Sequence, residues 1–351
     1  MSALAHAPRL PAPARPPGVS TGRAGPLPVC EGNPRQVLQA ALAACAAAVP
    51  ATLAVVLETE GSTYVRAGTF ALFSAGAHVG WLSGGCLEPE IERRAARAAA
   101  GGCIDWLEID SRDDDALFGG AATGCRGMQR IALLPLAALP GCGAVLSAWL
   151  DGQCTLRLAV SADGNLQLAA GAASAHWQLP AAVPDWTAAA GTWRVRLPRA
   201  PDAWVLGAGP EATTLLPLLR DLGWRVRLHE PRARWLAMHG EGCGDAGLGS
   251  GLADALASLP VPDVALVMHH SFERDRDALE LLADAAVPFI GLLGPPRRRD
   301  DLFRLLSEPR RNALRHRLHA PVGADLGGRG PQAIALSIAA QLQAWRHGAD
   351  A

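Results

Sequence analysis

An apolar segment that ends in a glycine-rich loop constrains the fold of this chain more than any other feature. Trp204, Val205 and Leu206 lead into Gly207-Ala208-Gly209, and a helical segment over residues 211–222 follows. A second apolar segment, over residues 224–229, ends at Glu230. A strand, a glycine loop, a helix and a second strand in this order predict a βαβ unit.

The loop of this unit predicts a binding site for a nucleotide-like ligand. Gly207 and Gly209 would let the backbone approach a pyrophosphate, and the helix N-terminus would offer free N–H groups and the positive end of its dipole. Glu230 follows Gly209 by roughly twenty residues, the spacing at which an acidic side chain meets a ribose. The alternative is an ordinary tight turn, which the glycines alone do not exclude.

Alternating strands and helices predict that the second half is a Rossmann-like, doubly wound α/β domain over residues 201–348. Its expected strands lie at residues 203–207, 224–229, 263–268 and 287–292. Because this domain begins past residue 200, the first half must hold another one. We expect a mixed α/β domain over residues 34–140, then a β-rich linker region over residues 141–200. Residues 1–33, rich in Pro, Ala and Arg, predict a disordered arm.

Composition excludes several classes of protein. The chain has 351 residues, of which 50% are hydrophobic and 19% charged, which suits two packed domains. Its net charge of −1 gives no support for nucleic-acid binding. No segment has the length and apolar character of a membrane span, and the N-terminus lacks the apolar core of a signal peptide. We therefore expect a cytoplasmic protein.

Two of the eight cysteines lie in settings that favour reactivity. Cys86 ends the run Ser83-Gly84-Gly85-Cys86 between a predicted strand and a predicted helix, and a helix N-terminus favours the thiolate. Cys125 lies in a glycine-flanked turn next to Arg126, a cation with the same effect. The alternative is a pair of small buried hydrophobic residues. We interpret the remaining six in that way, because no Cys-x-x-Cys pair or disulfide framework is visible.

Polar residues at two further places are candidates for binding. The segment 61–68 has hydroxyl groups and an arginine that would suit an anion, although it is equally typical of a hairpin loop. His269, His270 and Asp275 follow the apolar strand 263–267, and therefore lie at the carboxyl end of the sheet, where ligands bind in such folds. A zinc ion there would need more ligands at suitable spacings than the sequence offers.

Taken together, these motifs resemble the XdhC/CoxI family, the maturation factors of xanthine dehydrogenase and related molybdenum hydroxylases. The resemblance runs from about residue 34 to 347. The matching segments are Ser83–Glu88, Gly124–Gly127, Gly207–Gly209, His270 with Asp275, Gly291–Gly294 and Ala320–Gly327.

This chain departs from the family pattern at several positions. Arg126 replaces a glycine, His269 a threonine, Ser271 an aspartate and Pro295 a serine. Two glutamates that follow Pro331 in the family are Gln332 and Ala333 here, and Gln341 replaces a glutamate in the last helix. These departures leave the expected fold unchanged and indicate a divergent member of the family.

The resemblance implies a protein that holds the molybdenum cofactor, assists its sulfuration and delivers it to an apo-molybdenum hydroxylase. Cys86 and Cys125 would contact the metal or its sulfur, since soft thiolates suit both. Gly207, Gly209, Glu230, His270 and Asp275 would hold the phosphate or nucleotide end.

A cysteine desulfurase and a second copy of the chain are further expected partners. The alternatives are an NAD(P)-dependent oxidoreductase, which the same glycine loop would suit, and a nucleotide-binding regulatory protein.

Overall fold

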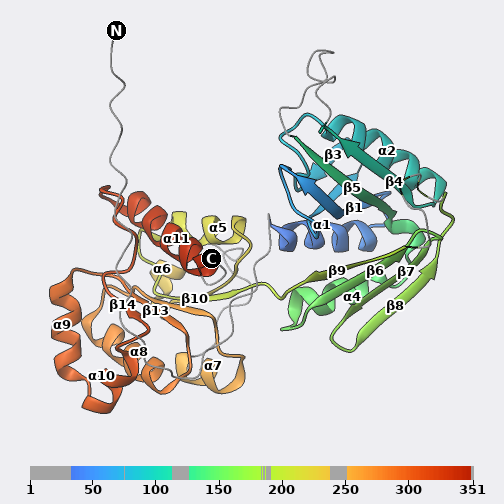
Figure 1. The fold of residues 1–351 in the computed structure, drawn as a ribbon. Helices are drawn as coiled ribbons and strands as arrows, with labels where there is room; N and C mark the ends of the chain where they lie inside the picture. The colour runs from blue at the N-terminus through green and yellow to red at the C-terminus, as the bar shows by residue number, and fades with distance from the viewer. Residues whose placement is uncertain are drawn as a thin grey trace, which may run out of the picture.

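The residues that the structure describes form three β-sheets, two in the N-terminal half of the chain and one in the C-terminal half (Figure 1). It is a computed structural model. The residues that it describes are 33–74, 76–112, 126–182, 184, 186, 191–237 and 251–348.

The first sheet is antiparallel and has the strand order β3-β2-β1-β5-β4. Its strands are β1 (Thr52–Gly61), β2 (Phe70–Ser74), β3 (Ala77–Val79), β4 (Asp105–Asp110) and β5 (Gly127–Pro135). Helix α2 (Glu88–Gly101) packs on one face, where Ile91 and Ala95 meet Ile131 and Leu133 of β5. Helix α1 (Pro34–Ala46) packs on the other face. Both faces are therefore covered, which explains why β1 and β5 are buried over most of their length.

The start of α1 is the one that the sequence predicts. The Asn33 side-chain oxygen accepts a hydrogen bond from the Gln36 backbone N–H at 3.1 Å, and Pro34 takes the first helical position. The Asn33 amide nitrogen also donates to the Arg220 carbonyl at 2.8 Å, so this cap links α1 to the C-terminal domain.

Residues 141–200 form the expected β-strands and, in addition, a helix. The predicted strands are present as part of an antiparallel sheet of order β8-β7-β6-β9. Its strands are β6 (Leu156–Ser161), β7 (Asn165–Ala170), β8 (Ala173–Gln178) and β9 (Thr192–Leu197). The 3₁₀ turn η1 (Leu136–Ala138) and helix α4 (Cys142–Asp151) precede this sheet, and the helix differs from the β-rich region predicted there. Buried side chains of α1, α4, the first sheet and this sheet form one continuous core.

The C-terminal half is a doubly wound α/β domain, which confirms the predicted fold class. All neighbouring strands of its sheet are parallel, in the order β11-β10-β12-β13-β14. They are β10 (Asp202–Leu206), β11 (Arg225–His229), β12 (Val264–Val267), β13 (Phe289–Leu292) and the two-residue strand β14 (Leu318–His319).

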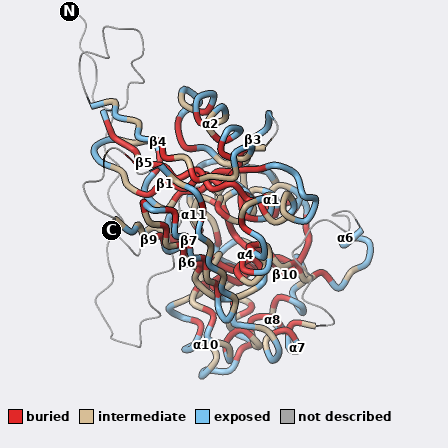
Figure 2. Tube along the Cα trace, turned by 90° about the vertical axis from the view of Figure 1, so that its right-hand side faces the viewer, coloured by how far each residue is buried: buried red, intermediate tan, exposed pale blue. Residues whose placement is uncertain are grey.

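Helices cover both faces of this parallel sheet (Figure 1). On one face lie α5 (Ala212–Asp221) and α11 (Pro331–Gly348), and on the other α7 (Leu252–Ser258), α8 (Phe272–Asp284), α9 (Pro296–Leu305) and α10 (Glu308–Leu314). Burial on both faces explains the continuous apolar character of the strands, such as Trp204 to Leu206. The short helix α6 (Ala233–Ala237) is mostly exposed (Figure 2).

No helix in the described part of the chain is both long and apolar enough to span a membrane.

Gly207 is fixed by backbone packing, which leads to a first prediction. It has φ = +110°, and a Cβ at this position would lie 2.5 Å from the His269 backbone nitrogen and the Met268 carbonyl. We expect Gly207→Ala to lower the free energy of unfolding by about 1–3 kcal/mol, measured by chemical denaturation. The control is Gly251→Ala in the same domain, where a Cβ meets its nearest atom at an ordinary 3.8 Å. Equal stability of the two variants would show that the loop can shift away from β12.

Candidate functional site

Cys86 lies in the loop that leads from β3 into α2. It is exposed, and the next residue, Leu87, is the N-cap of α2. The thiol is therefore held at the N-terminus of a 14-residue helix, as the sequence predicts. Its sulfur lies 3.7 Å from the Ser83 hydroxyl oxygen.

A buried carboxylate fixes the shape of this loop. Glu88 is 5% exposed, and its side chain accepts hydrogen bonds from the backbone N–H of Leu82 at 3.1 Å and of Ser83 at 2.8 Å. The Ser83 hydroxyl donates to the same carboxylate, and accepts from the backbone N–H of Gly85 and Leu87. Burial raises the pKa of Glu88, but these hydrogen bonds outweigh it and hold the pKa below its usual value. The carboxylate is therefore ionised and anchors the loop.

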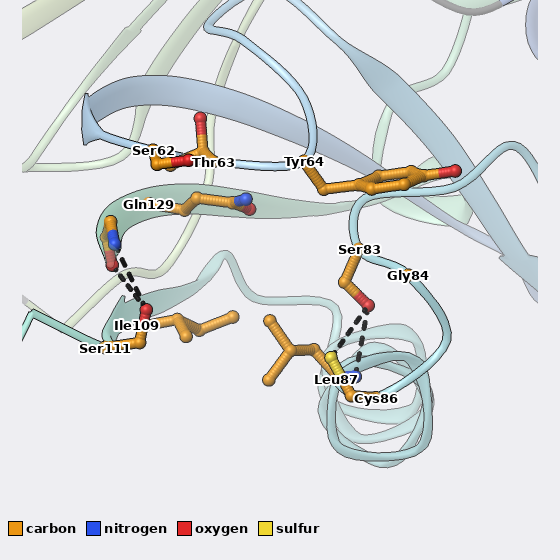
Figure 3. Close-up of a pocket in the computed structure, with 11 residues that line it drawn as sticks. Ser62, Thr63, Tyr64, Ser83, Gly84, Cys86, Leu87, Ile109, Ser111 and Gln129 are labelled. Carbon is orange, nitrogen blue, oxygen red and sulfur yellow. Dashed lines mark hydrogen bonds between the residues drawn. The ribbon is translucent and has the colours of Figure 1, made fainter. Parts of the chain in front are cut away.

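A pocket lies beside Cys86, on the face of the first sheet that α2 covers (Figure 3). Tyr64 and Gln129 lie on one side of it, and Ile109 and Leu87 lie across from them. Its complete lining is Ser62, Thr63, Tyr64, Ser83, Gly84, Cys86, Leu87, Ile109, Ser111, Gly127 and Gln129. The lining thus combines hydroxyl groups, an amide and a thiol with the apolar side chains of Ile109 and Leu87.

Gln129 is the unusual member of this lining. It is 5% exposed, and it pairs with Thr59 of β1 on one side and Ile109 of β4 on the other. Its side-chain oxygen is buried and has no hydrogen-bond partner among the residues that the structure describes. Buried polar atoms without a hydrogen-bond partner are uncommon in proteins, and each lowers the free energy of unfolding.

The second predicted thiol, Cys125, lies outside the described residues, and the structure does not test its role. Gly127, two residues further along the chain, does line the pocket. The Ser62 backbone N–H donates to the Arg126 carbonyl at 3.1 Å. A Cβ at Gly127 would overlap the Ser62 carbonyl, so only glycine fits there.

A different cysteine pair was interpreted from the sequence as two unreactive residues. The sulfur atoms of Cys45, in α1, and Cys142, in α4, lie 3.4 Å apart. The hydrogen bond with Cys142 lowers the pKa of Cys45 to about 7, whereas it raises the pKa of Cys142, which is also buried. Residues 97 positions apart become neighbours only when α1 packs on α4, so no local pattern could predict this pair.

The predicted residues of the C-terminal domain gather at the carboxyl end of its sheet. Gly207 and Gly209 follow β10, and His270 follows the adjacent strand β12. β11 and β12 lie on opposite sides of β10, so the direction of the chain connections reverses between β10 and β12. The loops after β10 and β12 therefore meet at a topological switch point. Ligands of doubly wound folds bind at this point.

Glu230 holds the glycine loop in place. Its carboxylate is 6% exposed and accepts hydrogen bonds from the Ala208 backbone N–H at 2.7 Å and from the Arg232 backbone N–H at 2.9 Å. The Arg232 guanidinium contacts both carboxylate oxygens at 2.7 Å. Burial raises the pKa of Glu230, but the hydrogen bonds from Arg232 and Ala208 outweigh it and lower the pKa to about 2. A ribose could bind this carboxylate only in competition with those partners.

His270 and Glu211 cover Gly209. A Cβ on Gly209 would lie 2.7 Å from His270 Nε2 and 2.8 Å from a Glu211 carboxylate oxygen. These two side chains are joined by a 3.1 Å contact. His270 has φ = +56°, a conformation uncommon outside glycine, and about half of its side chain is exposed. A phosphate group could reach Gly209 only after the His270 ring had moved.

Asp275 is fully buried and binds the start of the loop that follows β12. One carboxylate oxygen accepts the backbone N–H of His269 at 3.1 Å and lies 3.1 Å from the His269 ring nitrogen. The other accepts from the Arg298 guanidinium at 2.6 Å. Asp275 and His269 therefore hold the end of β12, and His270 alone of the three faces solvent. Within the described residues no group of three or more His, Cys, Asp or Glu could hold a metal ion.

The predicted site residues thus fall into two groups. Cys86 belongs to a pocket lined by residues of the first sheet and its loops. The second group lies at the switch point and consists of Gly207, Gly209, Glu230, His270 and Asp275.

Two residues of these sites, Gln129 and Glu211, are not among those predicted from the sequence. Gln129 precedes the apolar run of β5 and stands next to the polar Arg130, so the sequence offers little signal for it. Glu211 likewise gives little signal, since acidic residues are common at the start of helices.

Comparisons with known proteins agree with this arrangement. Residues 203–342 match the family model described as the XdhC Rossmann domain, and residues 44–108 match the model of the XdhC and CoxI family. Together the two matches cover more than half of the chain. The chain belongs to the XdhC and CoxI family.

Individual relatives support the assignment over most of the chain. A protein from Bacillus subtilis (strain 168), described as a probable xanthine dehydrogenase subunit, is 25% identical over 309 residues, which are 83% of this chain and 92% of that protein. An uncharacterized protein, YqeB, from Escherichia coli (strain K12) is 34% identical over 90 residues, 25% of this chain and 16% of that one. A crystal structure of a xanthine dehydrogenase from Bacillus halodurans has the same fold, with a TM-score of 0.71 and 24% identity over 90% of this chain and 96% of that chain.

The lowered pKa of Glu230 predicts how stability depends on pH. Because its folded pKa is about 2 and its ordinary value 4.5, its contribution to the free energy of unfolding is fully present above about pH 4.5. It falls as the pH is lowered toward 2. We expect Glu230→Gln to remove about 2 kcal/mol of this acid-dependent stability, measured by denaturant titrations between pH 6 and pH 3. The exposed Glu273→Gln on α8 is the control. A wild-type pH dependence in Glu230→Gln would contradict the prediction.

Proposed function

We propose that this protein carries the molybdenum cofactor as cargo, holds it while the metal receives its terminal sulfur, and delivers it to an apo-molybdenum hydroxylase. The observation that carries the proposal is the exposed Cys86 thiol, fixed at the N-terminus of α2 beside a polar-rimmed pocket. Membership of the XdhC and CoxI family and a relative named as part of a xanthine dehydrogenase support it.

The chemistry of the Cys86 loop suits such a cargo. A thiolate is a soft ligand, and both molybdenum and sulfane sulfur are soft partners. The Glu88 network positions the thiol through Ser83, so the loop needs little rearrangement to present it. Cys125 is proposed as a second soft ligand. Gly127, two residues after it, lines the same pocket.

The switch point of the C-terminal domain is proposed as the second contact, for the phosphate or nucleotide end of the cargo. The glycine loop and the N-terminus of α5 are the elements that would receive a phosphate. The His270 ring covers Gly209 and is half exposed, so it would turn outward when the ligand binds.

The proposed partners follow from this role. An apo-hydroxylase would accept the loaded cofactor, and a cysteine desulfurase would supply the sulfur. We place these exchanges in the cytoplasm, and a homodimer is a further proposal.

The rival activity, an NAD(P)-dependent oxidoreductase, is favoured by one observation, the glycine loop at the switch point. The carboxylates of Glu211 and Glu230 and the ring of His270 lie beside that loop, and they would affect a dinucleotide and the phosphate end of the cargo alike. The loop therefore does not separate the two roles. An oxidoreductase role would, however, leave the Cys86 pocket without a function.

Replacement of Cys86 tests the metal contact. We expect Cys86→Ala and Cys86→Ser to reduce bound molybdenum about tenfold or more in protein purified from cofactor-producing cells, because neither supplies a soft ligand. Molybdenum per chain is measured by mass spectrometry of the metal. The matched control is Cys103→Ala, at the opposite end of α2, which should retain wild-type metal content. Wild-type molybdenum in both Cys86 variants would rule out this contact.

An activation assay separates a carrier from a catalyst. We expect protein loaded with cofactor to activate an apo-molybdenum hydroxylase in proportion to the molybdenum supplied, whereas empty protein should not. The measurement is the activity of the recipient enzyme. Equal activation by loaded and empty protein, or turnover of NAD(P)H by this chain alone, would contradict the carrier role.

A further inference from the structure

We infer that the pocket beside Cys86 binds a flat nitrogen heterocycle, and that Gln129 accepts a hydrogen bond from an N–H group on the edge of that ring. The inference rests on the proposed function and assigns to this pocket the pterin ring of the cofactor.

The first observation is the unsatisfied oxygen of Gln129. The side chain is 5% exposed and lines the pocket, yet this oxygen has no partner among the described residues. A buried acceptor without a donor costs free energy that an apolar side chain would not. The residues that follow Gln129 inward along β5, such as Ile131 and Leu133, are apolar and pack on α2. A leucine at position 129 would extend this core, so packing alone does not account for the glutamine.

The second observation is the shape of the pocket. The Tyr64 ring and the Gln129 amide lie on one side, and the Ile109 and Leu87 side chains lie across from them (Figure 3). Tyr64 is 59% exposed and is the single tyrosine of the chain. An aromatic ring opposite aliphatic side chains suits the two faces of a planar ring. The Gln129 amide lies beside the Tyr64 ring (Figure 3), so it meets the edge of a ligand ring that stacks on Tyr64.

The chemistry of Gln129 narrows the class of ring. The carboxamide has an acceptor oxygen next to a donor nitrogen, which matches a ring edge that carries N–H beside a carbonyl or ring nitrogen. Glutamine pairs with adenine in the same bidentate manner. Pterins and nucleobases both have such edges, so the carboxamide of Gln129 would suit a ring of either class.

The position of Cys86 favours the pterin. The thiol and Gln129 line the same pocket, from the loop before α2 and from β5. In the molybdenum cofactor the metal is bound by the dithiolene next to the pterin, whereas a nucleobase lies beyond the phosphate groups. A cofactor whose metal contacts Cys86 therefore brings its pterin to Gln129.

The test is a fluorescence titration of the full-length protein with pterin-6-carboxylate, with GMP and CMP as competing ligands. We expect saturable binding of the pterin, weak competition by either nucleotide, and about tenfold weaker pterin binding by Gln129→Leu. Thermal unfolding of unliganded Gln129→Leu should occur at the same or a higher temperature, because the unsatisfied oxygen is gone. The control is Gln167→Leu, the same change at an exposed position of β7.

Tyr64 provides a second, independent variant. Tyr64→Phe keeps the aromatic face and should bind the pterin as the wild type does, whereas Tyr64→Ala should bind it more weakly. Because Tyr64 is exposed, neither change should prevent folding.

Several outcomes would overturn the inference: no saturable pterin binding, unchanged affinity in Gln129→Leu, or tighter binding of a nucleotide than of the pterin. These outcomes are distinguishable from failure of the proposed function. If molybdenum content still depends on Cys86 but pterin affinity does not depend on Gln129, the carrier role stands and the ring assignment fails. If pterin binding depends on Gln129 but molybdenum content ignores Cys86, the ring site stands and the metal contact fails.

Discussion

The buried carboxylate of Glu88 is the interaction on which the N-terminal site depends. It binds two backbone N–H groups and the Ser83 hydroxyl, and that hydroxyl in turn receives two further backbone N–H groups of the same loop. Five hydrogen bonds thus converge on two side chains that are both about 95% or more buried. Without them, glycines 84 and 85 would leave the loop free to adopt many conformations, and Cys86 would have no fixed position.

The C-terminal site uses the same physical device. Glu230 is also buried, also accepts backbone N–H groups from a glycine-containing loop, and is also kept ionised by its hydrogen bonds. In both halves a glycine loop that leads into a helix is held by an internal anion. The difference lies in what remains available to a ligand: Cys86 is exposed beside a pocket, whereas Gly209 is covered by His270 and Glu211.

This difference separates the two contacts that are proposed for the cargo. The N-terminal pocket lies beside the exposed Cys86, and its lining includes a side chain with an unsatisfied buried oxygen, Gln129. The switch point needs the His270 ring to move first. The proposed binding at the switch point therefore requires a side-chain rotation, whereas no side chain in the described part of the chain covers the Cys86 thiol.

The sequence by itself determined the doubly wound domain, the start of α1 and the place of Cys86 before α2, because these follow from local periodicity, capping and glycine loops. It also placed His270 and Asp275 at one end of β12, but not their separate roles, since burial of Asp275 depends on contact with Arg298 of α9. Only the tertiary structure paired Cys45 with Cys142, brought Gln129 opposite Ile109 and Leu87, and set His270 over Gly209. Each of these contacts joins segments far apart in the chain, and such pairings are fixed by packing of whole elements rather than by any local pattern of residues.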